Sequence, residues 1–134
     1  MKTEDIVSLF KEKNFRATPQ RIAVYDYVFE NRNHPDVIAV YANVKKQYPA
    51  FSKTTVYNAL KALEKAGFII PVMIDGERIR YDADTKLHGH FYCGVCKKIY
   101  DFETDQPQVS GLSGFSVKQK DVYYSGICPC CKNK

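Results

Sequence analysis

The chain has 134 residues, of which 45% are hydrophobic and 26% charged, a composition typical of one globular domain or two small ones. No apolar run approaches the roughly 20 residues that cross a bilayer, and the N-terminus does not resemble a secretory signal, so we expect a cytoplasmic protein. The net charge of +5 is mild. It permits nucleic-acid binding without requiring it.

Helices are expected throughout the first half, because apolar residues recur at helical spacing over residues 3–14, 19–30, 37–48 and 53–66. Thr18 before Pro19 and Ser52 before Lys53 are predicted N-caps, and Gly67 is predicted to end the last helix. The residues expected to face inward are Ile6, Leu9 and Phe10; Ile22, Tyr25, Val28 and Phe29; Val37, Val40, Tyr41 and Val44; and Val56, Leu60 and Leu63.

A β-hairpin is predicted next, with strands over residues 68–74 and 77–81 joined at Asp75-Gly76, and Pro71 suits an edge strand. Helices followed by a hairpin are the order of a winged helix-turn-helix. The polar face of the fourth helix could be merely solvated, but this order of elements favours contact with DNA phosphates and bases. The candidate DNA-binding residues are Ser52, Lys53, Thr54, Thr55, Tyr57, Asn58 and Lys61.

The second half is predicted to be a small sheet. Residues 83–87 are expected to be a hinge, and strands are expected over residues 89–92, 98–102 and 122–127. No helix is predicted over residues 103–114, which contain Pro107, Gly111 and Gly114. The fold class is therefore α+β, with a winged helix-turn-helix domain over residues 1–82 and a second domain over 88–134. So small a sheet needs a metal or a partner subunit for stability.

Two Cys-x-x-Cys pairs, Cys93 with Cys96 and Cys128 with Cys131, lie about 30 residues apart, the arrangement of a closed tetrahedral zinc site that contributes to folding. Cys130 could replace one member of the second pair. We prefer Cys128 and Cys131 because both pairs then have the same loop geometry, which makes Cys130 a spare thiol.

The histidines and two carboxylates suggest a second metal site. His88 and His90 lie on the same side of an expected strand, His34 lies in a loop, and Asp82 and Asp101 lie near the same predicted domain junctions. Nitrogen and oxygen ligands of this kind suit Fe(II), Mn(II) or Zn(II). Spacing alone does not show that these five residues belong together.

Motifs along nearly the whole chain resemble, in order, those of the ferric uptake regulator (Fur) family. They are Ala17-Thr18-Pro19-Gln20-Arg21, His34-Pro35, Thr54-Thr55-Val56-Tyr57-Asn58-Ala59-Leu60, Arg80-Tyr81-Asp82, His88-x-His90-x-x-Cys93-x-x-Cys96, Asp101-Phe102 and the last Cys-x-x-Cys. The resemblance implies a homodimeric bacterial metalloregulator, with an N-terminal winged-helix domain that binds a pseudo-palindromic DNA operator and a C-terminal α/β dimerisation domain that holds structural Zn²⁺.

Within the family the chain most resembles the peroxide-sensing, PerR-like branch, since Asp101 stands where iron sensors commonly have glutamate. The resemblance implies a repressor with regulatory Fe²⁺ or Mn²⁺, in which peroxide oxidises His34 or His88. Arg16 falls where a basic residue often enters the DNA minor groove. The regulatory ligands implied by the resemblance are His34, Asp82, His88, His90 and Asp101.

Two features depart from the family pattern: the extra thiol of Cys130, and residues 103–114, which are shorter and more broken than the usual dimerisation-domain helix. A reversible iron, zinc or manganese sensor on the same scaffold is the nearest alternative. A zinc-ribbon interaction module would leave the winged-helix order unexplained. A metalloenzyme is disfavoured, because no general base is evident beside an open zinc and the His-x-Glu deaminase motif is absent.

Overall fold

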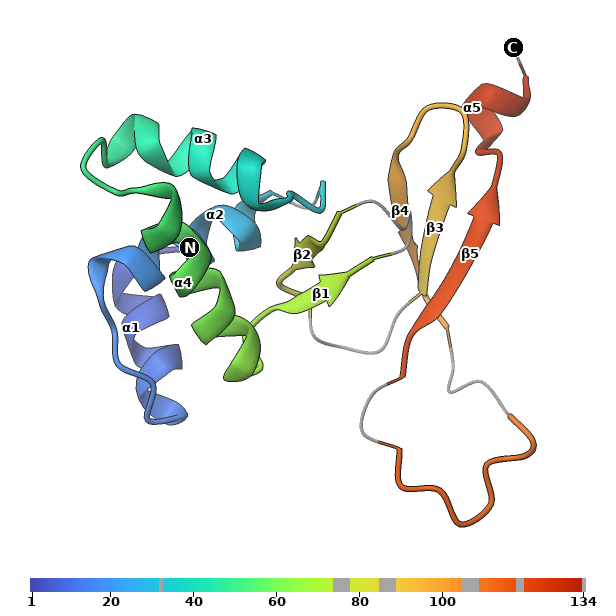
Figure 1. Ribbon diagram of the computed structural model, residues 1–134, viewed down its shortest axis with the longest axis horizontal. Coiled ribbons are helices and arrows are strands. Elements are labelled where there is room, and N and C mark those ends of the chain that lie inside the picture. The colour runs from blue at the N-terminus through green and yellow to red at the C-terminus, as the bar shows by residue number, and fades with distance from the viewer. Residues whose placement is uncertain (32, 74–77, 85–88, 105–108, 118–119, 134) are drawn as a thin grey trace. The chain divides into compact units, whose positions relative to one another are not determined.

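The computed structural model describes residues 1–31, 33–73, 78–84, 89–104, 109–117 and 120–133. The chain forms two compact units, Met1–Thr85 and Lys86–Lys134, and their boundary falls within the stretch predicted to be a hinge (Figure 1). Among the described residues, no helix is both long and apolar enough to cross a membrane.

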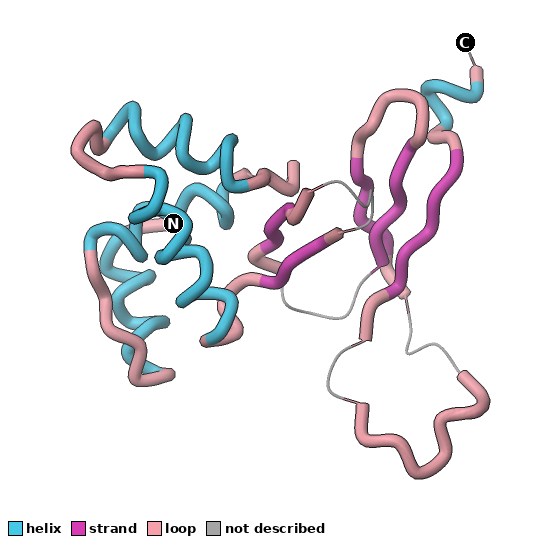
Figure 2. Tube along the Cα trace, viewed as in Figure 1, coloured by secondary structure: helices cyan, strands magenta, loops and turns pink. Residues whose placement is uncertain are grey.

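The first unit contains the predicted helices (Figure 2). Thr18 and Ser52 are N-caps as predicted: the Thr18 hydroxyl accepts the N–H of Arg21 at 3.2 Å, and the Ser52 hydroxyl accepts the N–H of Thr55 at 3.1 Å. Gly67 follows the last helix with φ +84°, a conformation that favours glycine. The helices are α1 (Thr3–Glu12), α2 (Pro19–Glu30), α3 (Val37–Gln47) and α4 (Lys53–Lys65).

The core of this unit is aromatic at its centre. The ring of Phe10 lies 5.0 Å from that of Phe15 and 4.9 Å from that of Phe68, so α1 is held against the end of α4. On α2 the predicted inward residues all belong to the core or pack against it, but the prediction omitted Val24. Val24 is fully buried, whereas Ile22 is only half-buried, because α2 packs against both α3 and α4 and buries more than one narrow stripe.

The predicted hairpin strands are present but shorter than expected. β1 (Ile70–Val72) pairs antiparallel with β2 (Arg80–Asp82), with Pro71 opposite Tyr81. The predicted turn at Asp75-Gly76 lies outside the described residues. The segment before α3 pairs with the edge of β2 that faces away from β1, since the N–H of Tyr81 donates to the carbonyl of Pro35 at 2.9 Å.

The second unit is a three-stranded sheet in the order β4-β3-β5 (Figure 1). β3 (Gly89–Cys93) pairs antiparallel with β4 (Ile99–Phe102) and parallel with β5 (Val122–Gly126). A one-turn helix that was not predicted, α5 (Pro129–Lys132), follows the sheet. Residues 109–117 form an exposed loop, and the described parts of 103–114 contain no helix, as expected (Figure 2).

Candidate metal centres

Four thiols of the second unit converge at one end of its sheet: Cys93, Cys96, Cys128 and Cys131. Their sulfur atoms all lie within 4.8 Å of one another, and the Sγ atoms of Cys96 and Cys128 are 3.8 Å apart. Four sulfurs at the usual zinc–sulfur distance of about 2.3 Å in a tetrahedron are separated by about 3.8 Å. The donor set therefore fits a closed zinc site.

Backbone amides favour the thiolate form of one of these cysteines. The sulfur of Cys93 accepts the N–H of Cys96 at 3.4 Å and that of Cys128 at 3.5 Å. These hydrogen bonds lower the pKa of Cys93 to about 6, so its thiolate predominates at neutral pH. A hydrogen bond from the Tyr100 hydroxyl also lowers the pKa of Cys128. Burial, together with hydrogen bonds to neighbouring thiols, raises the pKa of Cys131 to about 12.

Cys130 does not join the thiol cluster. It is exposed on α5, whereas Cys128 caps that helix and Cys131 lies three residues later. One helical turn brings residues three apart to the same side and directs the intervening residue away. The different positions of Cys130 and of its neighbours Cys128 and Cys131 therefore have a local cause in the helix.

A histidine and a carboxylate meet inside the first unit. The Nε2 atom of His34 lies 3.3 Å from Oδ2 of Asp82, and both residues are about as buried as the apolar core, with 3% and 4% exposed. The other carboxylate oxygen of Asp82 accepts the N–H of Asp84 at 2.8 Å. That hydrogen bond fixes the carboxylate so that Oδ2 faces the histidine.

The backbone of His34 is unusual. Its φ of +56° lies in the left-handed region, which residues with a side chain seldom adopt. Such conformations persist where neighbouring contacts hold them, and they concentrate at functional sites. The next residue supplies such a contact, because the carbonyl of Pro35 accepts the N–H of Tyr81 from β2.

A second histidine–carboxylate pair lies inside the second unit. His90 on β3 is directly opposite Asp101 on β4, and the two side chains approach to 3.5 Å between Nε2 and Oδ1. The Tyr123 ring on β5 flanks the imidazole, with ring centroids 6.0 Å apart. His90 is buried and Asp101 is exposed. His88, the other member of the predicted His-x-His pair, lies outside the described residues.

Each pair has the spacing of two ligands on one ion. Nitrogen and oxygen atoms about 2.1 Å from a metal lie about 3.0 Å apart at octahedral angles and about 3.4 Å apart at tetrahedral angles. The observed separations are 3.3 Å for His34 with Asp82 and 3.5 Å for His90 with Asp101. Two such ligands are too few for a complete metal site, so neither pair forms one by itself.

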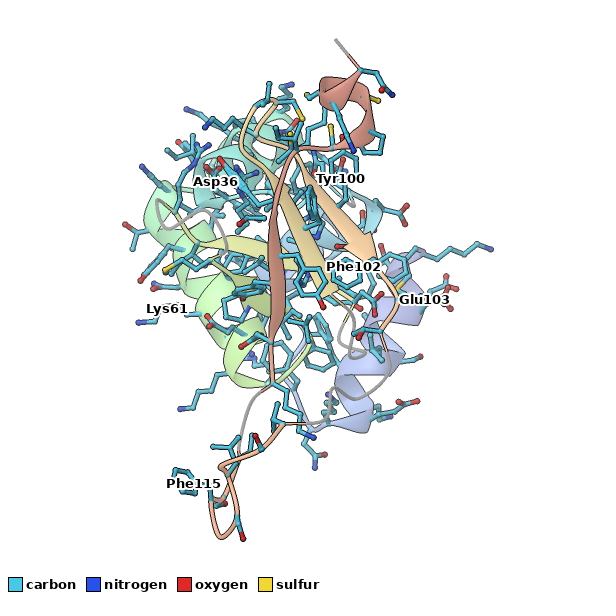
Figure 3. The ribbon with its side chains drawn as sticks, turned by 90° about the vertical axis from the view of Figure 1, so that its right-hand side faces the viewer. Asp36, Lys61, Tyr100, Phe102, Glu103 and Phe115 are labelled. Carbon is cyan, nitrogen blue, oxygen red and sulfur yellow. The ribbon has the colours of Figure 1, made fainter. Side chains whose placement is uncertain are left out.

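The predicted DNA-contacting residues lie on or beside α4. Lys53, Thr54, Tyr57, Asn58 and Lys61 are exposed, and the Lys61 ammonium lies 5.5 Å from the centre of the Tyr57 ring (Figure 3). Ser52 and Thr55 instead form the helix cap. A hollow of about 230 Å³ separates this surface from the start of α2, and it is lined by Thr18, Gln20, Arg21, Thr55, Asn58 and Ala59. Arg16 is exposed just before α2.

Sequence inspection missed other residues that organise these sites. Asp36 caps α3 and pairs with Arg78, and Tyr100 contacts the thiol cluster. An aspartate immediately before an apolar helical pattern is a usual N-cap signal and could have identified Asp36. The other two contacts bring together residues from separate elements, so no local pattern indicates them.

The chain belongs to the ferric uptake regulator family, whose model matches residues 12–125. It is 37% identical over 135 residues to the transcriptional regulator PerR of Clostridium acetobutylicum, covering 97% of this chain and 98% of that protein. Among solved structures it resembles PerR from Streptococcus pyogenes, with 30% identity, a TM-score of 0.55, and coverage of 96% and 92% of the two chains.

The fold is also that of the Helicobacter pylori ferric uptake regulator. That structure is 21% identical, with a TM-score of 0.74 and coverage of 98% of this chain and 95% of the other. The relatives named here are regulators of transcription or of metal uptake.

Proposed function

We propose that this protein is a metal-dependent, DNA-binding repressor that senses hydrogen peroxide. The observation that carries the proposal is a histidine–aspartate pair in each unit, each with the spacing of two ligands on one ion. Membership of the ferric uptake regulator family and similarity to PerR proteins from Clostridium acetobutylicum and Streptococcus pyogenes support it.

The first unit is proposed to be a winged helix-turn-helix domain. Helices α2, α3 and α4 provide its helical part, and the β1–β2 pair is the wing. α4 is the recognition helix, because its buried side is apolar and its exposed side presents Lys53, Tyr57 and Lys61, the last of which is labelled in Figure 3. These side chains, with Thr54 and Asn58, are suited to phosphates and base edges in the major groove.

The hollow beside α4 is suited to a phosphate. It opens at the N-terminus of α2, where the helix dipole is positive, and its lining includes Gln20 and Arg21. The Arg21 guanidinium is held in place, since it lies 4.3 Å from the Phe15 ring centre and donates to the Arg16 carbonyl at 3.0 Å. Arg16 would then extend into the adjacent minor groove. Ser52 and Thr55 contribute at the start of α4.

The thiol cluster is proposed to hold a structural Zn²⁺ through Cys93, Cys96, Cys128 and Cys131. The zinc closes the end of the sheet and stabilises the second unit, since a three-stranded sheet buries little apolar surface. The cluster leaves no ligand position for substrate, which supports a structural role over a catalytic one.

Regulatory Fe²⁺ or Mn²⁺ is proposed to be held jointly by His34 and Asp82 from the first unit and by His88, His90 and Asp101 from the second. Ligands from both units tie the DNA-binding domain to the dimerisation domain. The distance between the two recognition helices of a dimer is then restricted to one that fits operator half-sites about a helical turn apart. Metal thereby raises the affinity for DNA.

The peroxide response is proposed to occur at the ligands themselves. Bound Fe(II) supplies the one-electron chemistry toward hydrogen peroxide that Mn(II) supplies poorly. The ring of His34 or His88 gains one oxygen at the carbon between its nitrogens, while the O–O bond breaks and the second oxygen leaves as water. The imidazole is oxidised by two electrons and peroxide is reduced. The altered ring no longer ligates, and the repressor releases DNA.

A homodimer is proposed to form through the second unit, with a copy of the same chain as the partner. Tyr124 on the edge strand β5 is 60% exposed and stacks on Phe102 of β4, with ring centroids 5.1 Å apart (Figure 3). Such aromatic side chains are enriched in protein interfaces. Light scattering should give a dimer for the wild type and a smaller mass for Tyr124→Arg that retains its zinc.

Mass spectrometry tests the sensing step. Protein loaded with Fe(II) or Mn(II) is treated with peroxide and digested, and duplex binding is measured in parallel. We expect one added oxygen atom on a peptide containing His34 or His88, with iron only and together with loss of binding. Modification of cysteine peptides alone would replace this mechanism with thiol chemistry. No modification, with binding still dependent on metal, would favour a reversible iron, zinc or manganese sensor.

A further inference from the structure

Asp36, two residues after His34, joins α3 to the wing. Its Oδ1 atom accepts the N–H of Ala39 at 2.9 Å and so caps α3, while its Oδ2 atom accepts a hydrogen bond from Nη1 of Arg78 at 2.8 Å. The Asp36 side chain is only 10% exposed, whereas that of Arg78 is 54% exposed. One buried carboxylate therefore uses both of its oxygens to connect two separate elements.

The Asp36–Arg78 contact and the His34–Asp82 pair both lie where the segment before α3 pairs with β2 in an antiparallel ladder. Asp36 forms an antiparallel bridge with Arg80, and Pro35 accepts the N–H of Tyr81. The same register sets His34 opposite Asp82, whose side chains meet at 3.3 Å. Residues two apart on a strand share a side, so Asp82 lies on the same side of β2 as Arg80, the residue that is bridged to Asp36.

We propose that Asp36 is a positioning residue: through Arg78, it couples metal binding at His34 and Asp82 to the position of the wing. This inference rests on the proposed metal-dependent DNA binding. A ligand that bonds to both His34 and Asp82 fixes one end of the ladder at the separation already present, and the Asp36–Arg78 pair carries that constraint two residues further along the wing. Without the Asp36–Arg78 pair, His34 and Asp82 can still bind metal, but the wing is no longer held against α3.

The energetics favour an effect on coupling over an effect on folding. Arg78 is more than half exposed, and ion pairs with such an exposed partner contribute little to the stability of the fold. The capping function of Asp36 is preserved by serine, which is an equally good N-cap. Asp36→Ser therefore removes the link to the wing while keeping α3 capped.

Arg78 could instead act by contacting a DNA phosphate directly, and a double-mutant cycle separates the two roles. The variants are Asp36→Ser, Arg78→Ala and their combination. The matched control is Asp5→Ser, which removes an exposed acidic side chain of α1. The duplex is one that the wild-type protein selects from a random pool in Mn²⁺. The measured quantity is the ratio of duplex Kd without Mn²⁺ to Kd with it, alongside the Mn²⁺ affinity without DNA and the thermal midpoint.

We expect each single variant to lower this ratio roughly fivefold or more, within the usual range of coupling between sites. The double variant should lower it no further, with Mn²⁺ affinity and thermal midpoint unchanged, and Asp5→Ser should match the wild type. The inference would be overturned if Asp36→Ser kept the wild-type ratio of Kd values and Arg78→Ala weakened duplex binding equally in the wild type and in Asp36→Ser. Arg78 would then be a phosphate contact. A wild-type protein whose ratio is one would instead overturn the proposed function itself, and the inference with it.

Discussion

At the scale of single residues, the five cysteines show how position determines chemistry. Cys93 is buried and accepts two backbone hydrogen bonds, which favour its thiolate, whereas Cys130 is exposed on the outer side of a single helical turn. The two thiols therefore differ in environment, although Cys130 is directly adjacent in sequence to Cys131 of the thiol cluster. Their substitution should separate metal binding from thiol reactivity.

Cys93→Ser should release zinc, and Cys130→Ser should retain it. Loss of one thiolate from a four-sulfur site opens the tetrahedron, and structural zinc contributes much of the folding energy of small domains. Elemental analysis should find about one zinc per chain in the wild type and in Cys130→Ser, and much less in Cys93→Ser, which should also melt at a lower temperature. Equal zinc content in both variants would contradict this assignment.

Tyr81 provides a second prediction at this scale. Burial against the helices raises its pKa to about 12, so the folded protein holds the phenolic proton more tightly than the unfolded chain, whose tyrosines titrate near pH 10. The protonated Tyr81 phenol therefore contributes to the free energy of unfolding, relative to its ionised form. This contribution is complete below about pH 10 and is lost as the pH rises through about 12. It amounts to on the order of 2 kcal/mol.

Chemical unfolding of the wild type and Tyr81→Phe at several pH values measures this contribution. The two proteins should differ little near neutral pH. Between about pH 10 and 12, the free energy of unfolding should fall more steeply for the wild type than for the variant. Parallel curves over that interval would show that Tyr81 does not titrate as its burial implies.

At the scale of elements, features that depend on adjacent residues could be predicted from the sequence, whereas contacts between distant residues could not. The capped starts of α2 and α4 follow from Thr18-Pro19 and Ser52, whose roles depend only on adjacent residues. The Asp36–Arg78 pair and the approach of His34 to Asp82 depend on a loop lying beside β2, which spacing does not reveal. The histidine–aspartate sets came from family resemblance for the same reason. α5 was missed because one turn is too short for a periodic pattern.

The sheet of the second unit contains an element-scale constraint at Gly89. A Cβ atom at this position would lie 2.1 to 2.7 Å from carbons of the Phe102 ring, its partner across the strands. The Phe102 ring covers the glycine and stacks on Tyr124. An added methyl group must therefore displace an aromatic side chain of β4 that is already packed over Gly89 and against Tyr124.

Gly89→Ala should consequently destabilise the sheet, although alanine in a strand is otherwise more favourable than glycine. Overpacking of this kind costs about 1–3 kcal/mol. Thermal and chemical unfolding of zinc-loaded protein should show the loss, and Phe102→Leu in the Gly89→Ala background should recover part of it. Additive effects of the two substitutions would mean that the ring and the glycine are not in contact in solution.

At the scale of the whole molecule, the proposed function requires that the two units contribute ligands to one metal ion. His34 and Asp82 come from one unit, and His90 and Asp101 come from the other. Neither pair alone satisfies a six-coordinate ion, so under this proposal tight binding of Mn²⁺ or Fe²⁺ requires both units. Metal and DNA then select the same arrangement of the chain, and each must raise the affinity for the other.

This linkage can be measured without knowledge of the regulated genes. Mn²⁺ affinity is determined by calorimetry with and without a duplex that the wild-type protein has selected, and duplex affinity is determined with and without Mn²⁺. The two ratios should be equal, at roughly 5- to 150-fold. His90→Ala should bring both ratios to one while zinc is retained, because it removes a ligand from one unit only, and Cys130→Ser should leave both unchanged. A Mn²⁺ affinity that is indifferent to DNA would mean that the metal does not join the units, however tightly it binds.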